Sequence, residues 1–167
     1  MDININSITL CYLNICGILG KIKDPVFINE CQQYDILCFV ETKLEDCIME
    51  YITDEFRAFG YKIHAKNRKK MSKTKSGGIL VAFKERLDSI ISIVETKSKI
   101  VQWIVIAETI ISKKIAVGTV YLPPKQSPYA SVEQFNELEV EISRFDLEDY
   151  NLIICGILIL IQEHLVK

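Results

Sequence analysis

Asn14 and Glu41 each follow an apolar run with the composition of a buried strand. In an open α/β sheet, ligands collect in the crevice beyond the carboxyl ends of the strands. An amide and a carboxylate facing one crevice could hold a hard cation such as Mg²⁺, whose coordination shell is completed by water and substrate phosphates. The same two residues could instead be polar residues that simply end their strands. The local sequence leaves both alternatives open.

Basic residues gather in one segment, 62–75, which holds seven Lys or Arg and no acid. The whole chain has 20 Lys+Arg, 22 Asp+Glu and a net charge of −2, so it has no overall attraction to polyanions. A block of like charge is usually a solvated loop, but it could also supply the phosphate contacts of a nucleic-acid-binding surface. The residues that would make those contacts are Lys66, Arg68, Lys69, Lys70, Lys73 and Lys75.

Hydrophobic periodicity predicts the elements that position these residues. Strands are expected at 8–13, 35–40, 61–65, 79–83, 90–94, within 101–111, at 115–122 and from 152, and helices at 25–34, 45–59 and 132–145. Many strands with three interspersed helices indicate the α/β class, with a mixed sheet or a pair of sheets. A strand, a helix and a second buried strand at the N-terminus favour a parallel crossover connection.

Particular residues mark the ends and inner faces of these helices. Asp24 followed by Pro25 is typical of a helix start, Gly60 of a helix end, and Ser131 of an N-cap. Helical spacing predicts that the buried side chains come from Val26, Ile28 or Asn29, Cys31, Ile48, Ile52, Phe56, Phe59, Phe135, Leu138, Ile142 and Phe145. Trp103 begins an apolar run and is expected in the core.

The six cysteines, at 11, 16, 31, 38, 47 and 155, form no Cys-x-x-Cys pair and stand mostly in apolar runs. This pattern is typical of buried free thiols in a reducing compartment, although four of them could pair or bind zinc. The longest apolar stretch, 152–161, is shorter than the roughly 20 residues that span a bilayer. The N-terminus also lacks a signal-peptide pattern. We therefore expect an intracellular protein of the nucleus or cytoplasm, with no membrane association and no disulfide partner.

Four blocks, in order along essentially the whole chain, resemble the successive motifs of the endonuclease/exonuclease/phosphatase superfamily. They are 9–14 (TLCYLN), 35–44 (DILCFVETKL), 76–82 (SGGILVA) and 118–124 (GTVYLPP). The most specific parts are the Glu-Thr-Lys and Tyr-x-Pro-Pro blocks. Within the superfamily, the sequence is most similar to the apurinic-type endonuclease domain of non-LTR retrotransposons.

The resemblance implies the N-terminal part of a four-layer α/β sandwich, in which two mixed β-sheets are flanked by helices. It further implies a Mg²⁺-dependent phosphodiesterase that cleaves DNA. Asn14 matches the family residue that orients the site, Glu41 the residue that binds the metal, and Tyr121 a residue close to the scissile phosphate. Hydrolysis of a phosphate ester needs a cation against the developing charge and donors that hold the oxygens in line.

The chain departs from the family at its last predicted strand. Where the family has Gly-Asp-Phe-Asn or Gly-Asp-Leu-Asn, this chain reads Gly156, Ile157, Leu158 and Ile159. Aliphatic side chains can neither accept a proton nor bind a metal. The family's Ser-Asp-His block, which carries the catalytic His, is expected later, but the sequence ends at Lys167.

These departures predict a truncated, inactive domain over 1–156 and a divergent tail over 157–167. The tail has a simple genetic interpretation: the codons GAT TTT AAT encode Asp-Phe-Asn, and loss of the first G gives Ile-Leu-Ile. An alternative function is a non-catalytic nucleic-acid-binding module that uses the basic segment 62–75. A phosphatase acting on lipid or small phosphates is a third possibility, supported only by analogy of fold.

Overall fold

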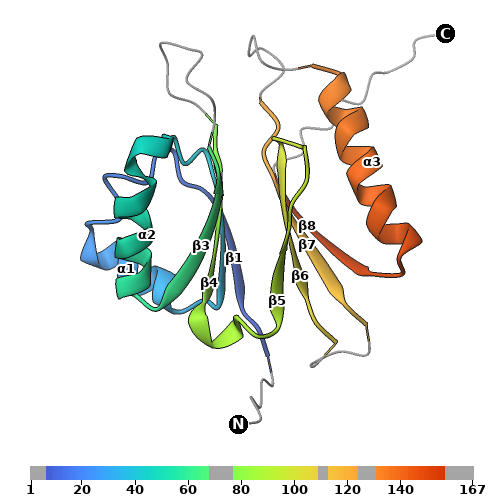
Figure 1. The fold of residues 1–167 in the computed structure, drawn as a ribbon. Helices are drawn as coiled ribbons and strands as arrows, with labels where there is room; N and C mark the ends of the chain where they lie inside the picture. The colour runs from blue at the N-terminus through green and yellow to red at the C-terminus, as the bar shows by residue number, and fades with distance from the viewer. Residues whose placement is uncertain (1–6, 68–76, 109–112, 124–130, 157–167) are drawn as a thin grey trace, which may run out of the picture.

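A computed structural model describes residues 7–67, 77–108, 113–123 and 131–156. In sheet A the strand order is β1-β2-β4-β3, and in sheet B it is β5-β6-β7-β8. Helices α1 and α2 cover the outer face of sheet A and α3 covers that of sheet B, which gives four layers (Figure 1). The elements are β1 (Leu10–Asn14), α1 (Pro25–Gln32), β2 (Ile36–Val40), α2 (Met49–Ala58), β3 (Tyr61–Lys66), β4 (Ile79–Lys84), β5 (Ile91–Val94), β6 (Val101–Ile106), β7 (Ile115–Val120), α3 (Glu133–Leu147) and β8 (Asn151–Gly156), with short 3₁₀ helices η1 (Asp46–Ile48) and η2 (Glu85–Leu87). The predicted α/β class with two mixed sheets is confirmed.

Each sheet has one parallel pair at its edge and two antiparallel pairs. In sheet A, β1 runs parallel to β2, as the predicted crossover requires, and β4 pairs with β2 and β3 in the antiparallel sense. In sheet B, β7 and β8 are parallel while β5, β6 and β7 are antiparallel. The strands of each parallel pair therefore end together, β1 with β2 in sheet A and β7 with β8 in sheet B.

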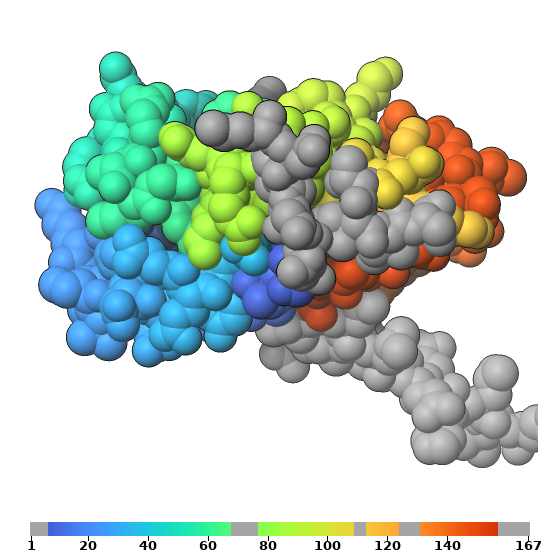
Figure 2. Space-filling view, turned by 90° about the horizontal axis from the view of Figure 1, so that it is seen from below, coloured from blue at the N-terminus to red at the C-terminus, as the bar shows by residue number. Residues whose placement is uncertain are grey.

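The two sheets pack face to face, with β2 opposite β7 and β4 opposite β6. Edge strands β1 and β8 therefore lie on the same side of the sandwich. Figure 2 shows the two halves side by side, with the first residues of β1 (dark blue) next to atoms of β8 (red). Ile8, Leu10 and Cys155 are partly buried against one shared core between the sheets.

Three apolar clusters fill the gaps between the four layers. Leu37 and Phe39 of β2 face the helices, whereas Ile36 and Cys38 face sheet B, so β2 is buried on both faces. This is why its sequence reads as a continuous apolar run rather than an alternating one. In sheet B, Trp103 is fully buried as expected, because its pairing partner in β7 is a glycine that leaves room for the indole ring.

The predicted helix start at Asp24 is confirmed, because its side chain accepts a hydrogen bond from the N–H of Val26 and Pro25 opens the helix. The N-cap prediction for Ser131 is wrong: α3 begins at Glu133, its N-cap residue is Val132, and no side chain caps it. Gln134 instead accepts a hydrogen bond from the backbone N–H of Ser131.

Two side chains predicted to face inward are exposed. Val26, at 71% exposure, lies in the first turn of α1, and Phe135, at 46%, lies in the first turn of α3. Their neighbours Phe27 and Leu138 take the inward positions. Helical spacing identifies a buried stripe, but it does not determine which positions of the first turn the sheet covers.

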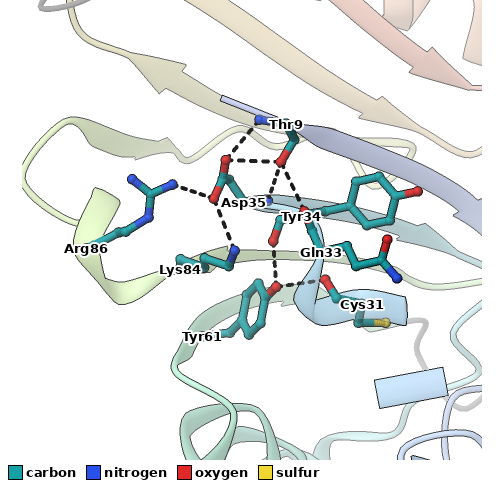
Figure 3. A network of polar contacts seen from close by, with 8 residues as sticks. All are labelled: Thr9, Cys31, Gln33, Tyr34, Asp35, Tyr61, Lys84 and Arg86. Atoms are coloured by element: carbon teal, nitrogen blue, oxygen red, sulfur yellow. Dashed lines mark hydrogen bonds and ion pairs between the residues drawn. The ribbon is translucent and has the colours of Figure 1, made fainter. Parts of the chain in front are cut away.

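A buried carboxylate, Asp35, lies at the start of β2 (Figure 3). It accepts hydrogen bonds from the backbone N–H and the hydroxyl of Thr9, both at 3.0 Å, and forms ion pairs with Arg86 at 2.6 Å and Lys84 at 3.3 Å. Burial alone would raise the pKa of Asp35, but these contacts outweigh it and lower the pKa from 3.8 to about 2. The contacts tie the start of β2 to the segment before β1 and to the end of β4.

The cysteines are all free thiols, and their burial is more varied than expected. Cys31 and Cys38 are buried, and Cys11 and Cys155 are half-buried, but Cys16 and Cys47 are exposed. Cys16 lies in the loop after β1 and Cys47 in the short helix η1, so neither belongs to a buried strand or helix face. Among the residues that the structure describes, no helix has the length and apolar character needed to cross a membrane.

Candidate functional site

Glu41 and Tyr121 meet between the two sheets. Glu41 follows the last residue of β2 and Tyr121 follows the last residue of β7. The Tyr121 hydroxyl donates a hydrogen bond to Oε1 of Glu41. The two residues that the sequence singled out in separate motifs therefore share one site at the end of the sandwich.

The backbone at Glu41 turns its side chain toward sheet B. Along β2, Ile36 and Cys38 face sheet B and Phe39 faces the helices, so strict alternation would point residue 41 toward the helices. Glu41 instead has a φ of 57°, in the left-handed region that L-residues rarely adopt. Alternation is thereby broken at Glu41, and its carboxylate reaches Tyr121 on the opposite sheet.

The other oxygen of the Glu41 carboxylate binds a backbone group. The N–H of Gly77, just before β4, donates to Oε2 of Glu41 at 3.0 Å. Each carboxylate oxygen can accept two hydrogen bonds or metal contacts. Among the described residues each oxygen accepts one hydrogen bond, which leaves each with a lone pair that could bind a cation.

Asn14 lies in the row of residues beside this carboxylate. It pairs across the sheet with Val40, which immediately precedes Glu41. Its side-chain oxygen accepts a hydrogen bond at 3.2 Å from the N–H of Cys16, where the chain leaves β1. The side chain is exposed at the strand end, and this contact fixes the orientation of its amide.

Lys66 ends the same row at the far edge of sheet A, because Val40 and Lys66 both pair with Ile79 of β4. Its ammonium group donates to the carbonyl of Ser98 at 2.8 Å and to Thr96 in the loop between β5 and β6. Lys66 therefore ties sheet A to sheet B, as the Glu41–Tyr121 contact does.

The charge of Lys66 is partly withdrawn from solvent. Burial lowers the pKa of Lys66, and the carboxylate of Glu95, together with two carboxylates on α3, opposes that change. A lysine held in this way differs from the exposed cations that contact phosphates. The other predicted nucleic-acid-binding residues, Arg68, Lys69, Lys70, Lys73 and Lys75, lie outside the described residues.

The described part of the chain holds no complete set of side-chain metal ligands. Within it, no cluster of three or more His, Cys, Asp or Glu side chains could hold a metal. Strand β8 ends at Gly156, which pairs with Val120 beside Tyr121. The next residue, Ile157 in the sequence, follows that end but lies outside the described residues.

Sequence reasoning missed two parts of the site. The first is the contact from Gly77, whose glycine pair was noted only as part of a motif. The second is the left-handed backbone at Glu41, which no property of a glutamate indicates. The strongest available signal was the Gly-Gly dipeptide, because paired glycines mark a backbone that turns or approaches another segment closely.

Comparison with solved structures identifies proteins of the same fold. An AP endonuclease from Archaeoglobus fulgidus matches 90% of this chain with 17% sequence identity and a TM-score of 0.58. The APE2 catalytic domain from Xenopus laevis matches 89% with 13% identity and a TM-score of 0.62. A 3′ phosphatase from Neisseria, bound to a product DNA hairpin, matches 90% with 13% identity and a TM-score of 0.55.

The matched chains are much longer than this one. The match covers 56% of the length of the archaeal enzyme and 57% of the length of each of the other two proteins. The chain thus spans just over half of each. No protein-family model and no curated protein matches the sequence.

Proposed function

The chain has the fold of the endonuclease/exonuclease/phosphatase superfamily, and on that premise we propose that it carries the metal-binding part of a DNA phosphodiesterase site. The single observation that carries the proposal is the held carboxylate of Glu41, which lies at a strand end between the two sheets. DNA is the proposed partner, because one protein of the same fold is bound to a DNA product and two others are AP endonuclease-type proteins.

The donor set fits a hard divalent cation such as Mg²⁺. Glu41 keeps one lone pair on each oxygen, and Mg²⁺ needs only one or two carboxylates when water and substrate phosphates complete its shell. A bound cation would neutralise the negative charge that develops on the phosphate oxygens.

The neighbouring side chains would orient the phosphate. The bond that the amide oxygen of Asn14 accepts from Cys16 orients the amide, and its NH₂ group can donate to a phosphate oxygen. The Tyr121 hydroxyl holds the carboxylate from the opposite sheet, close to where that phosphate would lie. Glu41 would thus bind the cation, while Asn14 and Tyr121 would orient the phosphate and the carboxylate beside it.

We expect this chain to bind metal without cleaving DNA. The residue after Gly156 is aliphatic, so it cannot orient an attacking water.

The closer resemblance to retrotransposon endonucleases supports an origin in such an element. The genomic sequence tests that origin: a frame after codon 156 that encodes Asp-Phe-Asn and a later Ser-Asp-His supports it, and a frame that encodes neither contradicts it.

Titration with Mn²⁺, which accepts the same oxygen ligands as Mg²⁺, tests the metal site. In ¹⁵N-resolved NMR spectra, bound Mn²⁺ should broaden the amide signals of residues 41–43 and 77–78 first. Glu41→Gln should abolish this broadening. The matched control is Glu85→Gln, which removes the same charge. Glu85 is exposed in η2, at the other end of β4. Broadening that survives in Glu41→Gln would contradict the proposal.

A further inference from the structure

The loop that carries Glu41 is clamped by the glycine pair before β4. We infer that Gly77 and Gly78 are positioning residues for the Glu41 carboxylate; the inference rests on the function proposed above. Residues 41–43, which follow β2, form the Glu41 turn.

Backbone hydrogen bonds hold the Glu41 turn from one side. Besides the bond from Gly77 to the carboxylate, the N–H of Lys43 donates to the carbonyl of Gly77 at 2.9 Å. The N–H of Thr42 donates to the carbonyl of Gly78 at 3.4 Å. The glycine pair therefore contacts every residue of the turn.

A second segment holds the turn from the other side. The N–H of Gly17 donates to the carbonyl of Glu41 at 2.7 Å, and the N–H of Ile18 donates to the carbonyl of Thr42 at 3.1 Å. The turn lies between these two segments, and the side chain of Thr42 is only 1% exposed. Its position is thus set by contacts on both sides rather than by its own sequence.

The Glu41 turn needs such support because its backbone is strained. Glu41 has a φ of 57° and Lys43 a φ of 56°, and neither is a glycine. Residues in the left-handed region persist only where the surrounding structure holds them there. Loss of the clamp would let Glu41 return to an extended backbone, and its carboxylate would then turn away from Tyr121.

Gly78 is the position where a side chain would break the clamp. A Cβ atom there would lie 2.5 Å from the hydroxyl oxygen of Thr42 and 3.5 Å from the backbone nitrogen of Lys43. The first distance is far shorter than any normal contact, so the buried side chain of Thr42, or the turn that carries it, would have to move. Gly78 also has a φ of 94°, which disfavours any side chain at that position.

Gly78→Ala tests the inference, with Gly60→Ala as its matched control. Gly60, after α2, has a similar φ of 81°, but a Cβ there would meet no atom within 4 Å. Both variants carry the backbone strain, and only Gly78→Ala carries the clash. We expect Gly78→Ala to weaken Mn²⁺ binding by about tenfold or more, while Gly60→Ala leaves the affinity of the folded protein unchanged.

A metal-free measurement separates this inference from the proposed function. In NMR spectra of the metal-free protein, the Gly77 amide proton should resonate downfield because it binds a charged carboxylate. Glu41→Gln and Gly78→Ala should each move that signal upfield, and Gly60→Ala should not. If the wild type binds no Mn²⁺ but the Gly77 signal behaves in this way, the proposed function fails and the positioning inference stands.

A second substitution should rescue the first. Thr42→Ala removes the hydroxyl that the new methyl group would strike, and the next contacts in Gly78→Ala are at 3.5 Å and 3.7 Å. We expect the double variant Thr42→Ala/Gly78→Ala to recover most of the Mn²⁺ affinity and the Gly77 signal, even if Gly78→Ala alone does not fold. A Gly77 amide signal that is the same in the wild type and in Glu41→Gln, or a folded double variant that does not recover the wild-type Gly77 signal, would overturn the inference.

Discussion

The hydroxyl of Tyr121 donates to Oε1 of Glu41, and this bond joins residues 80 positions apart in the sequence. Glu41 belongs to the end of β2 in sheet A, and Tyr121 to the end of β7 in sheet B. The site therefore exists only when both sheets have formed and packed. Any change that shifts one sheet relative to the other should change the site without touching its residues.

Tyr121→Phe should weaken the site while keeping the fold. The ring stays, but Glu41 loses one hydrogen bond, so we expect the free energy of unfolding to fall by about 1 kcal/mol. Mn²⁺ affinity should fall as well, because the carboxylate is less well oriented. Urea unfolding and Mn²⁺ titration measure the two effects. Tyr51→Phe is the control, since Tyr51 is exposed on α2; equal losses in both variants would contradict the role given to Tyr121.

The end of β2 could be predicted from the sequence because a buried apolar run stops there at a charged residue. The direction in which Glu41 points could not. It depends on a left-handed backbone that is held by hydrogen bonds to Gly77 and Gly78 on one side and to Gly17 and Ile18 on the other. These hydrogen bonds join residues far apart along the chain. Tyr121 could be placed at a strand end, but its contact with Glu41 depends on how the two sheets pack.

Local patterns also missed the long-range roles of two charged residues. In the sequence Asp35 is the polar first residue of a predicted strand, and its partners Thr9, Lys84 and Arg86 come together only in the folded sheet. Lys66 reads as part of a basic block. Its actual partners lie in the loop between β5 and β6, which the sequence does not connect with β3.

Asp35→Asn should reduce stability at neutral pH and remove part of the acid sensitivity. The folded pKa of Asp35, about 2, is below its ordinary value of 3.8. Its contribution is therefore complete above pH 3.8 and is lost as the pH falls toward 2. We expect a loss of about 2 kcal/mol at pH 7, measured by urea unfolding at pH 7 and across pH 4 to 2.

The control for this experiment is Asp88→Asn. Asp88 pairs with Lys62, and the two side chains are 50% and 48% exposed. Exposed ion pairs contribute roughly 0 to 1 kcal/mol, so Asp88→Asn should change stability little at any pH. A wild-type stability that is flat between pH 4 and 2, or an equal loss in both variants, would contradict the role assigned to Asp35.

Strands β1 and β8 form open edges without a charged side chain. Leu13, Ile153 and Ile154 are 41%, 43% and 37% exposed there, and no further strand pairs with either edge among the residues that the structure describes. Unpaired apolar edges promote association through strand pairing. The opposite edge of sheet A, β3, carries the exposed charge of Lys62, which disfavours such pairing.

Leu13→Lys/Ile153→Lys should therefore reduce self-association. Sedimentation velocity over a range of concentrations measures the change. The wild type should show a larger weight-average sedimentation coefficient than the double variant. Val140→Lys is the control, because Val140 is 71% exposed but lies on α3, where the backbone is already hydrogen-bonded. Self-association that falls equally in both variants would show that general surface hydrophobicity, rather than the strand edges, causes it.

Plasmid relaxation with Mg²⁺ tests most directly whether the chain holds a metal site without the groups that complete hydrolysis. Wild type and Glu41→Gln are incubated with supercoiled plasmid over the same range of protein concentrations. The account predicts that both leave the plasmid supercoiled to the same extent, although the wild type alone binds the metal. Nicking by the wild type that Glu41→Gln abolishes would contradict it.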